Sequence, residues 1–234
     1  MPRALPVSRR LSTAARWPVG IALTSWRYMW RTTPIRRSER HGHPEDPEAP
    51  PLPDSIEQAE IQTPEAGAGP LFHRLYRTTI RDAKCSANEL MKQITADPNK
   101  VAPTELARFI KLKGEKDLMH VGDEFTVRMP GPWDGPVRVI NMTPTSFRLV
   151  TLDGHLEAGQ IEFRAHEDDY LVFEIESWAR SGDKLSSLLF DRLRFAKEVQ
   201  LHMWLSVLER VTRLAGGTRA GLNSIETRRF DIDD

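Results

Sequence analysis

The fold of this chain is decided by residues 161–214, IEFRAHEDDYLVFEIESWARSGDKLSSLLFDRLRFAKEVQLHMWLSVLERVTRL, because the spacing of apolar residues changes within them. Before Asp183 apolar residues recur at every second position, as expected of strands with one buried face. From Asp183 the spacing is helical for about 32 residues, or roughly 48 Å at 1.5 Å per residue. The helical stripe comprises Leu185, Leu189, Ala196, Val199, Met203, Val207, Val211 and Leu214. The sequence therefore predicts a sheet followed by one long helix that crosses it.

The segments that precede this stretch extend the same sheet. Alternating patterns occur at residues 71–81, 108–112, 124–129, 137–139 and 147–149, with glycine and proline between most of them. Together with 160–164 and 173–176 they predict seven strands. After the first strand, Ser86 and Glu89 have the spacing of a capping box, which predicts a helix through Ile94. A second short helix or a turn is expected near residues 103–106.

Charge divides the chain into parts. Residues 1–40 carry nine arginines and one acid, and residues 41–70 carry seven acids and no lysine or arginine. Prolines are frequent in the acidic part, which is typical of an extended linker. We therefore expect an Arg-rich arm (1–40), an acidic Pro-rich linker (41–70), one folded domain (71–215) and a C-terminal tail (216–234). The single cysteine, Cys85, excludes an intramolecular disulfide and is typical of a cytoplasmic protein.

The arm contains one amphipathic segment, Trp17–Arg31. Wound as a helix, it has tryptophans and leucine on one face and arginines on the other, and it is too short to span a bilayer. Such a helix suits an anionic membrane surface, which predicts a cytoplasmic, membrane-peripheral protein. Docking on the folded domain or on a protein partner explains the same stripe, and a targeting segment is a third alternative. The near-neutral domain carries no nucleic-acid motif, so we expect no nucleic-acid partner.

The order of elements resembles the helix-grip domains of the START-type (SRPBCC) superfamily. The motifs GPWDGPV (131–137), TPTSF (143–147) and GH (154–155), with Glu157 and Gly159, resemble an uncharacterised bacterial domain-of-unknown-function family. The resemblance implies an α+β fold in which a seven-stranded antiparallel sheet curls around the long C-terminal helix. It also implies a cavity between sheet and helix for an apolar or amphipathic molecule, such as a lipid or a polyketide.

Ligand-binding candidates follow from the side of the strands that faces this cavity. The inward positions and their polar neighbours are Phe125, Val127, Val139, Asn141, Phe147, Leu149, Thr151, Phe163, Phe173, Ile175 and Ser177, joined by His155 in a loop and Met203 on the helix. Asn141, Thr151 and Ser177 would donate hydrogen bonds to a ligand. Trp133, in a hairpin, would serve as a lid or as a partner contact.

Motifs for chemistry are few. Glu174 and Glu176 alternate with the inward residues, so we interpret them as surface charge pairs with Glu162 and Arg164. The sequence predicts no metal site, no cofactor and no catalytic residue. A ligand carrier or sensor is the first hypothesis. An enzyme of cyclase or hydrolase type, using His155 with Ser177 or Thr151, is the second, and an interaction module without ligand is the third.

Overall fold

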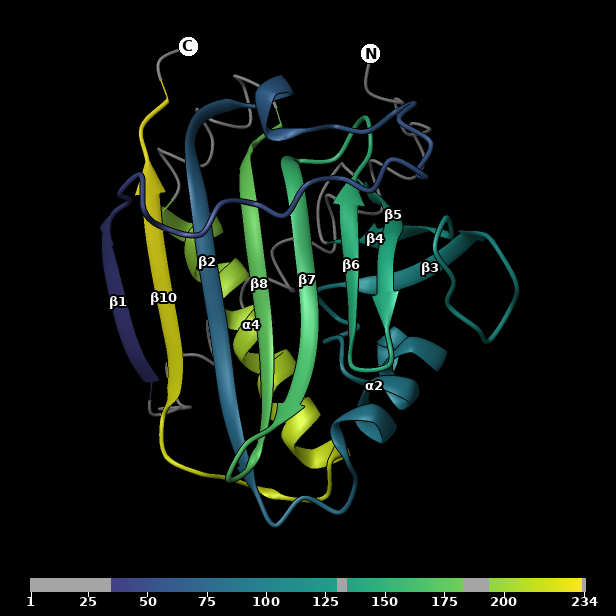
Figure 1. Cartoon of the computed structure of the whole chain (residues 1–234), viewed down its shortest axis with the longest axis vertical. Coiled ribbons are helices and arrows are strands. Elements are labelled where there is room, and N and C mark those ends of the chain that lie inside the picture. Colours follow the sequence, from purple (N-terminus) through teal and green to yellow (C-terminus); the bar gives the residue numbers. More distant parts are fainter. Residues whose placement is uncertain (1–34, 130–133, 183–193, 233–234) are drawn as a thin grey trace.

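The computed structural model describes residues 35–129, 134–182 and 194–232, and side chains are described in α4 from residue 200 onward. The helix predicted at Trp17–Arg31 and Trp133, for which a hairpin is predicted, lie outside these ranges. The described elements are β1 (Ile35–His41), η1 (Pro64–Ala66), β2 (Ala68–Arg81), α2 (Ala87–Ala96), η2 (Pro98–Lys100), β3 (Arg108–Lys113), β4 (Glu124–Arg128), β5 (Asp134–Thr143), β6 (Ser146–Thr151), β7 (Glu157–Glu167), β8 (Leu171–Ser181), α4 (Arg194–Leu214), β9 (Thr218–Arg219) and β10 (Asn223–Phe230). Figure 1 shows them.

One large sheet organises the fold. Its strand order is β1-β10-β2-β8-β7-β6-β5-β4-β3, with β9 paired to β2. All pairs are antiparallel except β1 with β10, which are parallel. The seven predicted strands are found as β2 to β8, but the described sheet has ten strands rather than seven. Of the three additional strands, β1 lies in the segment expected to be the arm and ends one residue into the expected linker, and β9 and β10 lie in the expected tail.

The sheet curls around α4, which lies behind it in Figure 1. The inner, concave face and the helix share one apolar core, in which Phe173, Ile175 and Leu208 are fully buried. Burying such side chains contributes roughly 2 kcal/mol each relative to exposure. Helix α2 begins at the predicted capping box, where Ser86 and Glu89 bond each other's backbone amides, and it contacts β7. Residues 103–106 form a turn and not a helix.

The acidic Pro-rich segment is not an extended linker in this structure. Residues 42–62, here called the strap, cross the outer, convex face of the sheet, in front of β2, β8 and β7 in Figure 1. Ile56 is buried against Ile140 and Val150, and the strap's carbonyl groups accept hydrogen bonds from the sheet. Proline has no backbone N–H, so a Pro-rich segment offers mainly acceptors, and the sheet supplies the donors.

The donors under the strap come from four neighbouring strands in order. Trp178 of β8 donates to the Pro47 carbonyl (3.4 Å), and Gln160 of β7 donates to the Pro50 carbonyl (2.7 Å). On the next strands, Arg148 of β6 donates to Pro51, and Arg138 of β5 donates to Glu57 and Ala59. The strap therefore runs across the strands rather than along one of them. Within the described part of the chain, no helix is both long and apolar enough to cross a membrane.

Candidate functional site

The concave face of the sheet changes from apolar to polar along β2. In one row across the strands, Ile225 of β10, Tyr76 of β2 and Ile175 of β8 stand side by side. Two residues nearer the start of β2, the corresponding row is Thr227, Arg74 and Ser177. We call this second set the polar row. Because all six side chains share one face, the sheet presents an apolar floor that ends at a polar edge.

A recess opens between the polar row and α4. Its walls come from β1, β10 and β2 and from Gln200 and Leu201 of the helix, and its volume is about 30 Å³. That volume holds roughly one or two water molecules. Its floor includes Arg74, Tyr76 and Ile225. Burial raises the pKa of Tyr76 to about 12, so its hydroxyl stays protonated at neutral pH.

Arg74 is the unusual residue of this recess, because it is charged, only 9 % exposed and on the inward face of a central strand. Among the described residues its ion-pair contact is to Oε1 of Glu157, at 3.9 Å, and that same oxygen accepts a hydrogen bond from Gln200 at 3.1 Å. The Arg74 guanidinium also lies 4.5 Å from the centre of the Phe72 ring. With the described residues this guanidinium forms one loose ion pair, which leaves donors for a further acceptor.

The predicted apolar ligand residues lie together on the concave face. Val127 packs against the core that the sheet shares with α4. The other seven are buried within that core: Phe125, Val139, Phe147, Leu149, Phe163, Phe173 and Ile175. The rings of Phe147 and Phe163 stack at 4.8 Å, and Trp204 of α4 meets Phe163 edge-on at 5.8 Å. These side chains fill the middle of the concave face with one another. Their role in binding a ligand stays a prediction.

On the described part of α4, Val207 and Val211 of the predicted stripe are buried in the core and Leu214 packs against it, but Met203 is not part of the core. Leu201, Leu205 and Leu208 are buried with Val207 and Val211, whereas Met203 is only partly buried and is not part of the core. Trp204 takes the inward position, between Tyr76 and Phe163. The spacing of four and three residues between Leu201, Leu205 and Leu208 is that of one buried helix face. The prediction of Met203 as an inward residue did not take this spacing into account.

Asn141 does not face the cavity. A β-bulge in β5 shifts the register, so that Val139 pairs with Leu149 but Asn141 pairs with Arg148 on the convex face. Beyond the bulge, Met142 pairs with Phe147 and packs against the core in the place expected for Asn141. One inserted residue reverses the faces, and nothing in a two-residue alternation reveals it.

The remaining polar candidates divide into two groups. Ser177 stands in the polar row beside Arg74, as expected of a cavity residue. The Thr151 hydroxyl instead bonds the backbone: it donates towards the carbonyls of Gln62 and Gly159 and accepts from the Gly159 amide. His155 lies in the loop before β7, where its Nδ1 accepts from the Glu157 amide at 2.9 Å. The Thr151 hydroxyl and the His155 imidazole therefore bond the local backbone and do not point to a ligand role.

His155 makes stability depend on pH. Burial lowers its pKa below the ordinary value of 6.5. As the pH falls, the unfolded chain therefore takes up a proton at this histidine before the folded protein does. The contribution of His155 to the free energy of unfolding is at its maximum above pH 6.5, declines below that pH, and stops changing once the pH is below the lowered pKa. We expect His155→Gln to flatten this decline in urea unfolding measured at pH 7.5 and 5.5. An unchanged slope would mean that another group causes it.

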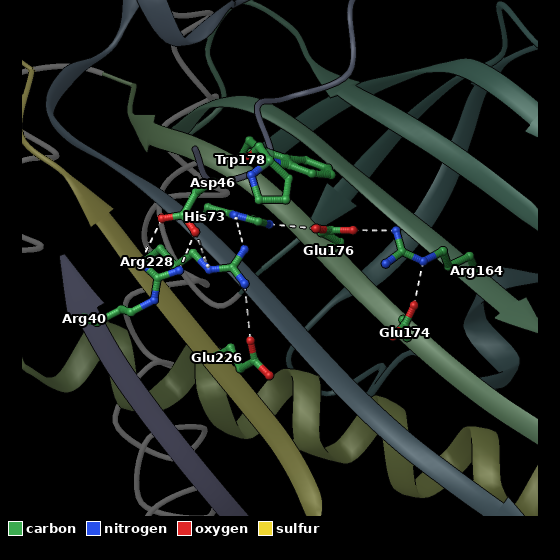
Figure 2. A network of polar contacts seen from close by, with 10 residues as sticks. Arg40, Asp46, His73, Arg164, Glu174, Glu176, Trp178, Glu226 and Arg228 are labelled. Carbon is green, nitrogen blue, oxygen red and sulfur yellow. Dashed lines mark hydrogen bonds and ion pairs between the residues drawn. The ribbon is translucent and has the colours of Figure 1, made fainter. Parts of the chain in front are cut away.

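A network of charged side chains occupies the convex face (Figure 2). Glu174 accepts from Arg77 and Arg164, each at 2.6 Å, and Glu176 bonds Arg164 and His73. The outward direction predicted for the two glutamates is confirmed, but they are 2 % and 8 % exposed rather than surface groups. The side chains that pair with them are Arg77 and Arg164 for Glu174 and His73 and Arg164 for Glu176.

His73 joins this network to the strap. Its Nδ1 lies 3.1 Å from a guanidinium nitrogen of Arg228, which can only donate, so Nδ1 accepts and Nε2 carries the proton that is donated to Glu176 at 2.7 Å. Arg228 and Arg40 in turn contact Asp46 of the strap. The hydrogen bonds from Arg40 and from the His43 amide hold the pKa of Asp46 well below its usual range. Sequence reasoning missed His73, because a lone histidine in a strand carries no motif.

Burial and pairing act in opposite directions on Glu176. Burial alone would raise the pKa of its carboxyl, but the hydrogen bonds from His73 and Arg164 outweigh burial and lower it. The carboxylate is thus ionised at neutral pH and held by two donors. Among the described residues, no group of three or more His, Cys, Asp or Glu side chains is arranged to hold a metal ion.

Comparison with known proteins supports the predicted resemblance. Residues 104–209 match a family described as a domain of unknown function (DUF1990), which covers less than half of the chain. No curated protein sequence matches the chain. The α+β arrangement expected from the resemblance, a large curled antiparallel sheet with a C-terminal helix, is present.

Solved structures with a similar chain path are distant in sequence. They include the di-domain ARO/CYC StfQ of the steffimycin biosynthetic pathway (TM-score 0.46, 11 % identity, 65 % of this chain and 52 % of that one). Major latex-like protein 151 from Panax ginseng is similar over 61 % of this chain and 97 % of its own (0.43, 13 %). Norcoclaurine synthase from Thalictrum flavum, in complex with dopamine and hydroxybenzaldehyde, is similar over 68 % and 95 % (0.41, 10 %). The alignment thus spans about half of StfQ.

Proposed function

We propose that this protein binds an amphipathic small molecule between the concave face of its sheet and α4. The polar end of the molecule lies at the polar row, and its apolar part lies over Tyr76 and Ile225. The observation that carries the proposal is the position of Arg74, an almost fully buried cation at the boundary between an apolar floor and a recess.

Burying Arg74 lowers the stability of the fold unless its charge is paired. Placing a charged group inside a sheet–helix interface loses hydration, and a single carboxylate contact at 3.9 Å returns little of it. A guanidinium offers five N–H donors in a planar fork, which matches a carboxylate, sulfonate or phosphate. Arg74 is thus suited to hold the anionic end of an amphiphile, in competition with Glu157.

Binding requires α4 to give way. The recess of about 30 Å³ is roughly ten times smaller than usual ligand pockets. Gln200 and Leu201 form its helical wall, so their movement would extend the recess along Tyr76 towards the core. If they do not move, the apolar core is complete without a ligand, and the interaction module expected as the third hypothesis is the better description. Catalysis in the same cavity stays a hypothesis from the sequence.

Location and partners stay proposals as well. A cytoplasmic protein that touches an anionic membrane through Trp17–Arg31 would meet amphiphiles at that surface. We propose this arrangement together with the binding function, and vesicle flotation with and without residues 1–34 tests it.

The first test is native mass spectrometry of the protein purified from its own host, followed by denaturing extraction. We expect a stoichiometric amphiphile. A clean apo mass, together with no thermal stabilisation by decanoate, decan-1-ol or 1-anilinonaphthalene-8-sulfonate, contradicts the proposal.

The second test is the substitution Arg74→Met. We expect decanoate to bind about tenfold more weakly, the loss of one charge-assisted contact, while binding of uncharged decan-1-ol is unchanged. Arg77→Met is the matched control, because Arg77 lies on the same strand but on the convex face, where it pairs with Glu174. Titration calorimetry measures both. Equal losses for the two variants would assign the effect to general surface charge.

A further inference from the structure

We infer that the proposed binding site extends beyond the recess, past Tyr76 and Ile225, to a second polar anchor formed by Thr78 and Asn223, which takes a hydroxyl group of the bound molecule. This inference rests on the proposed function and names the class of its ligand. Thr78 Oγ1 and Asn223 Oδ1 are both buried and have no hydrogen-bond partner among the described residues, and each residue is only 1 % exposed.

The two side chains belong to one row of the concave face. The register of β10 with β2 pairs Ser224 with Arg77 and Ile225 with Tyr76, so Asn223 follows opposite Thr78 on the inward side. Ile35 pairs with Asn223 on one flank, and Phe173 pairs with Thr78 on the other. The row is therefore apolar at its flanks and polar only at its centre.

Unsatisfied groups at such a place need an explanation. A buried donor or acceptor without a partner costs more than a satisfied hydrogen bond gains, so folded proteins rarely keep one. Here two stand side by side in an otherwise apolar layer. The Thr78 hydroxyl can donate, and Asn223 Oδ1 can accept. A ligand hydroxyl does both in return, since its oxygen accepts from Thr78 and its proton goes to Asn223.

The spacing of the two anchors defines the ligand. Thr78 follows Arg74 by four residues along β2, which separates their rows by about 13 Å at 3.3 Å per residue. An extended chain of roughly ten C–C bonds covers that length. Tyr76 and Ile225 form the row between the two anchors and line the recess. The ligand class is thus an amphiphile with an anionic end and a hydroxyl about ten bonds away.

The experiment compares 10-hydroxydecanoate with decanoate by titration calorimetry on the full chain. We expect the hydroxylated acid to bind about tenfold more tightly to the native protein, as two new hydrogen bonds in a buried site provide. In Thr78→Val the preference for the hydroxylated acid should be lost, so that the two acids bind equally. The variant's Tm should be unchanged or higher, because valine has the same shape and removes an unsatisfied hydroxyl.

Thr79→Val is the control, since Thr79 is the next residue on β2 and faces the opposite side of the sheet. It should leave the preference for the hydroxylated acid intact. If decanoate binds and the native protein does not prefer 10-hydroxydecanoate, the hydroxyl anchor is wrong and the proposed function stands. If Thr78→Val lowers Tm by several degrees and keeps the preference, the hydroxyl has a structural partner and the inference is overturned. If neither acid binds, the proposed function fails and the anchor fails with it.

Discussion

Replacing Glu176 by alanine should lower the free energy of unfolding by about 3 kcal/mol at pH 7. The carboxylate accepts from His73 Nε2 at 2.7 Å and from Arg164, and His73 is only 1 % exposed. Without Glu176 the imidazole proton has no acceptor and no access to water, so the cost of a buried unsatisfied donor adds to the lost charge pair. Urea unfolding followed by circular dichroism measures the change.

Glu226→Ala is the matched control, because Glu226 belongs to the same network in Figure 2 but its side chain is 44 % exposed and bonds Arg228 at 3.4 Å. An exposed ion pair contributes less than about 1 kcal/mol, so this variant should be close to native. Equal effects of the two variants would show that burial does not strengthen the network.

Acid should weaken the contribution of Glu176. The pKa of its carboxyl is lowered in the folded protein. The contribution of Glu176 to the free energy of unfolding is therefore fully present above the ordinary pKa of 4.5 and is lost as the pH falls from 4.5 through the lowered value. Between these two values the unfolded chain binds the proton and the folded protein does not. The stability difference between the native protein and Glu176→Gln should therefore decrease below pH 4.5. A difference independent of pH would contradict this linkage.

The elements that could be predicted are those whose signal is local. Alternation identified β2 to β8, because each of these strands buries one face in the common core. The capping box at Ser86 and Glu89 places the start of α2 by two reciprocal hydrogen bonds within four residues. The inward direction of Phe163, Phe173 and Ile175 follows from the same local pattern.

What could not be predicted depends on distant partners. β10 contains only two large apolar residues, and its inward Asn223 and Thr227 are polar, so alternation does not reveal a strand that exists by pairing with β1 and β2. Composition correctly describes the strap as unable to form its own core. It says nothing of donors such as Arg138, which is about 80 residues away in the chain.

The polar row and the Thr78–Asn223 pair belong to the same class of hidden feature. Arg74 lies between His73 and Leu75, which face the other side of β2, and charged and apolar residues occur on both faces of this strand. Only the pairing with β10 and β8 shows which residues share a row with Arg74. Sequence reasoning found Ser177 by alternation alone. It could not find Arg74, because an arginine in a strand is expected to face water.

The second large effect should come from Arg138→Met, which should destabilise the protein by about 3 kcal/mol and loosen the strap. The Arg138 guanidinium donates to the carbonyls of Glu57 (2.7 Å) and Ala59 (3.0 Å) and makes two contacts to Glu124, at 2.9 and 3.1 Å. All these bonds are lost together. Hydrogen exchange at the amides of Ile56, Ile61 and Gln62 should become faster, since these amides bond within the strap or to β6.

Arg148→Met provides the contrast, because Arg148 lies under the same strap on the neighbouring strand. Its side chain makes one long bond to the strap, to Pro51 at 3.4 Å, while Nε and one terminal nitrogen are buried and have no partner in the described part of the chain. Burial lowers the pKa of this guanidinium, as expected of a cation that its surroundings do not satisfy. Methionine keeps the apolar stem and removes the unsatisfied charge. We expect Arg148→Met to be neutral or to stabilise the protein by about 1 kcal/mol, and to leave strap exchange unchanged. Destabilisation equal to that of Arg138→Met would mean that charge alone, rather than the bonds that each arginine makes, holds the strap to the sheet.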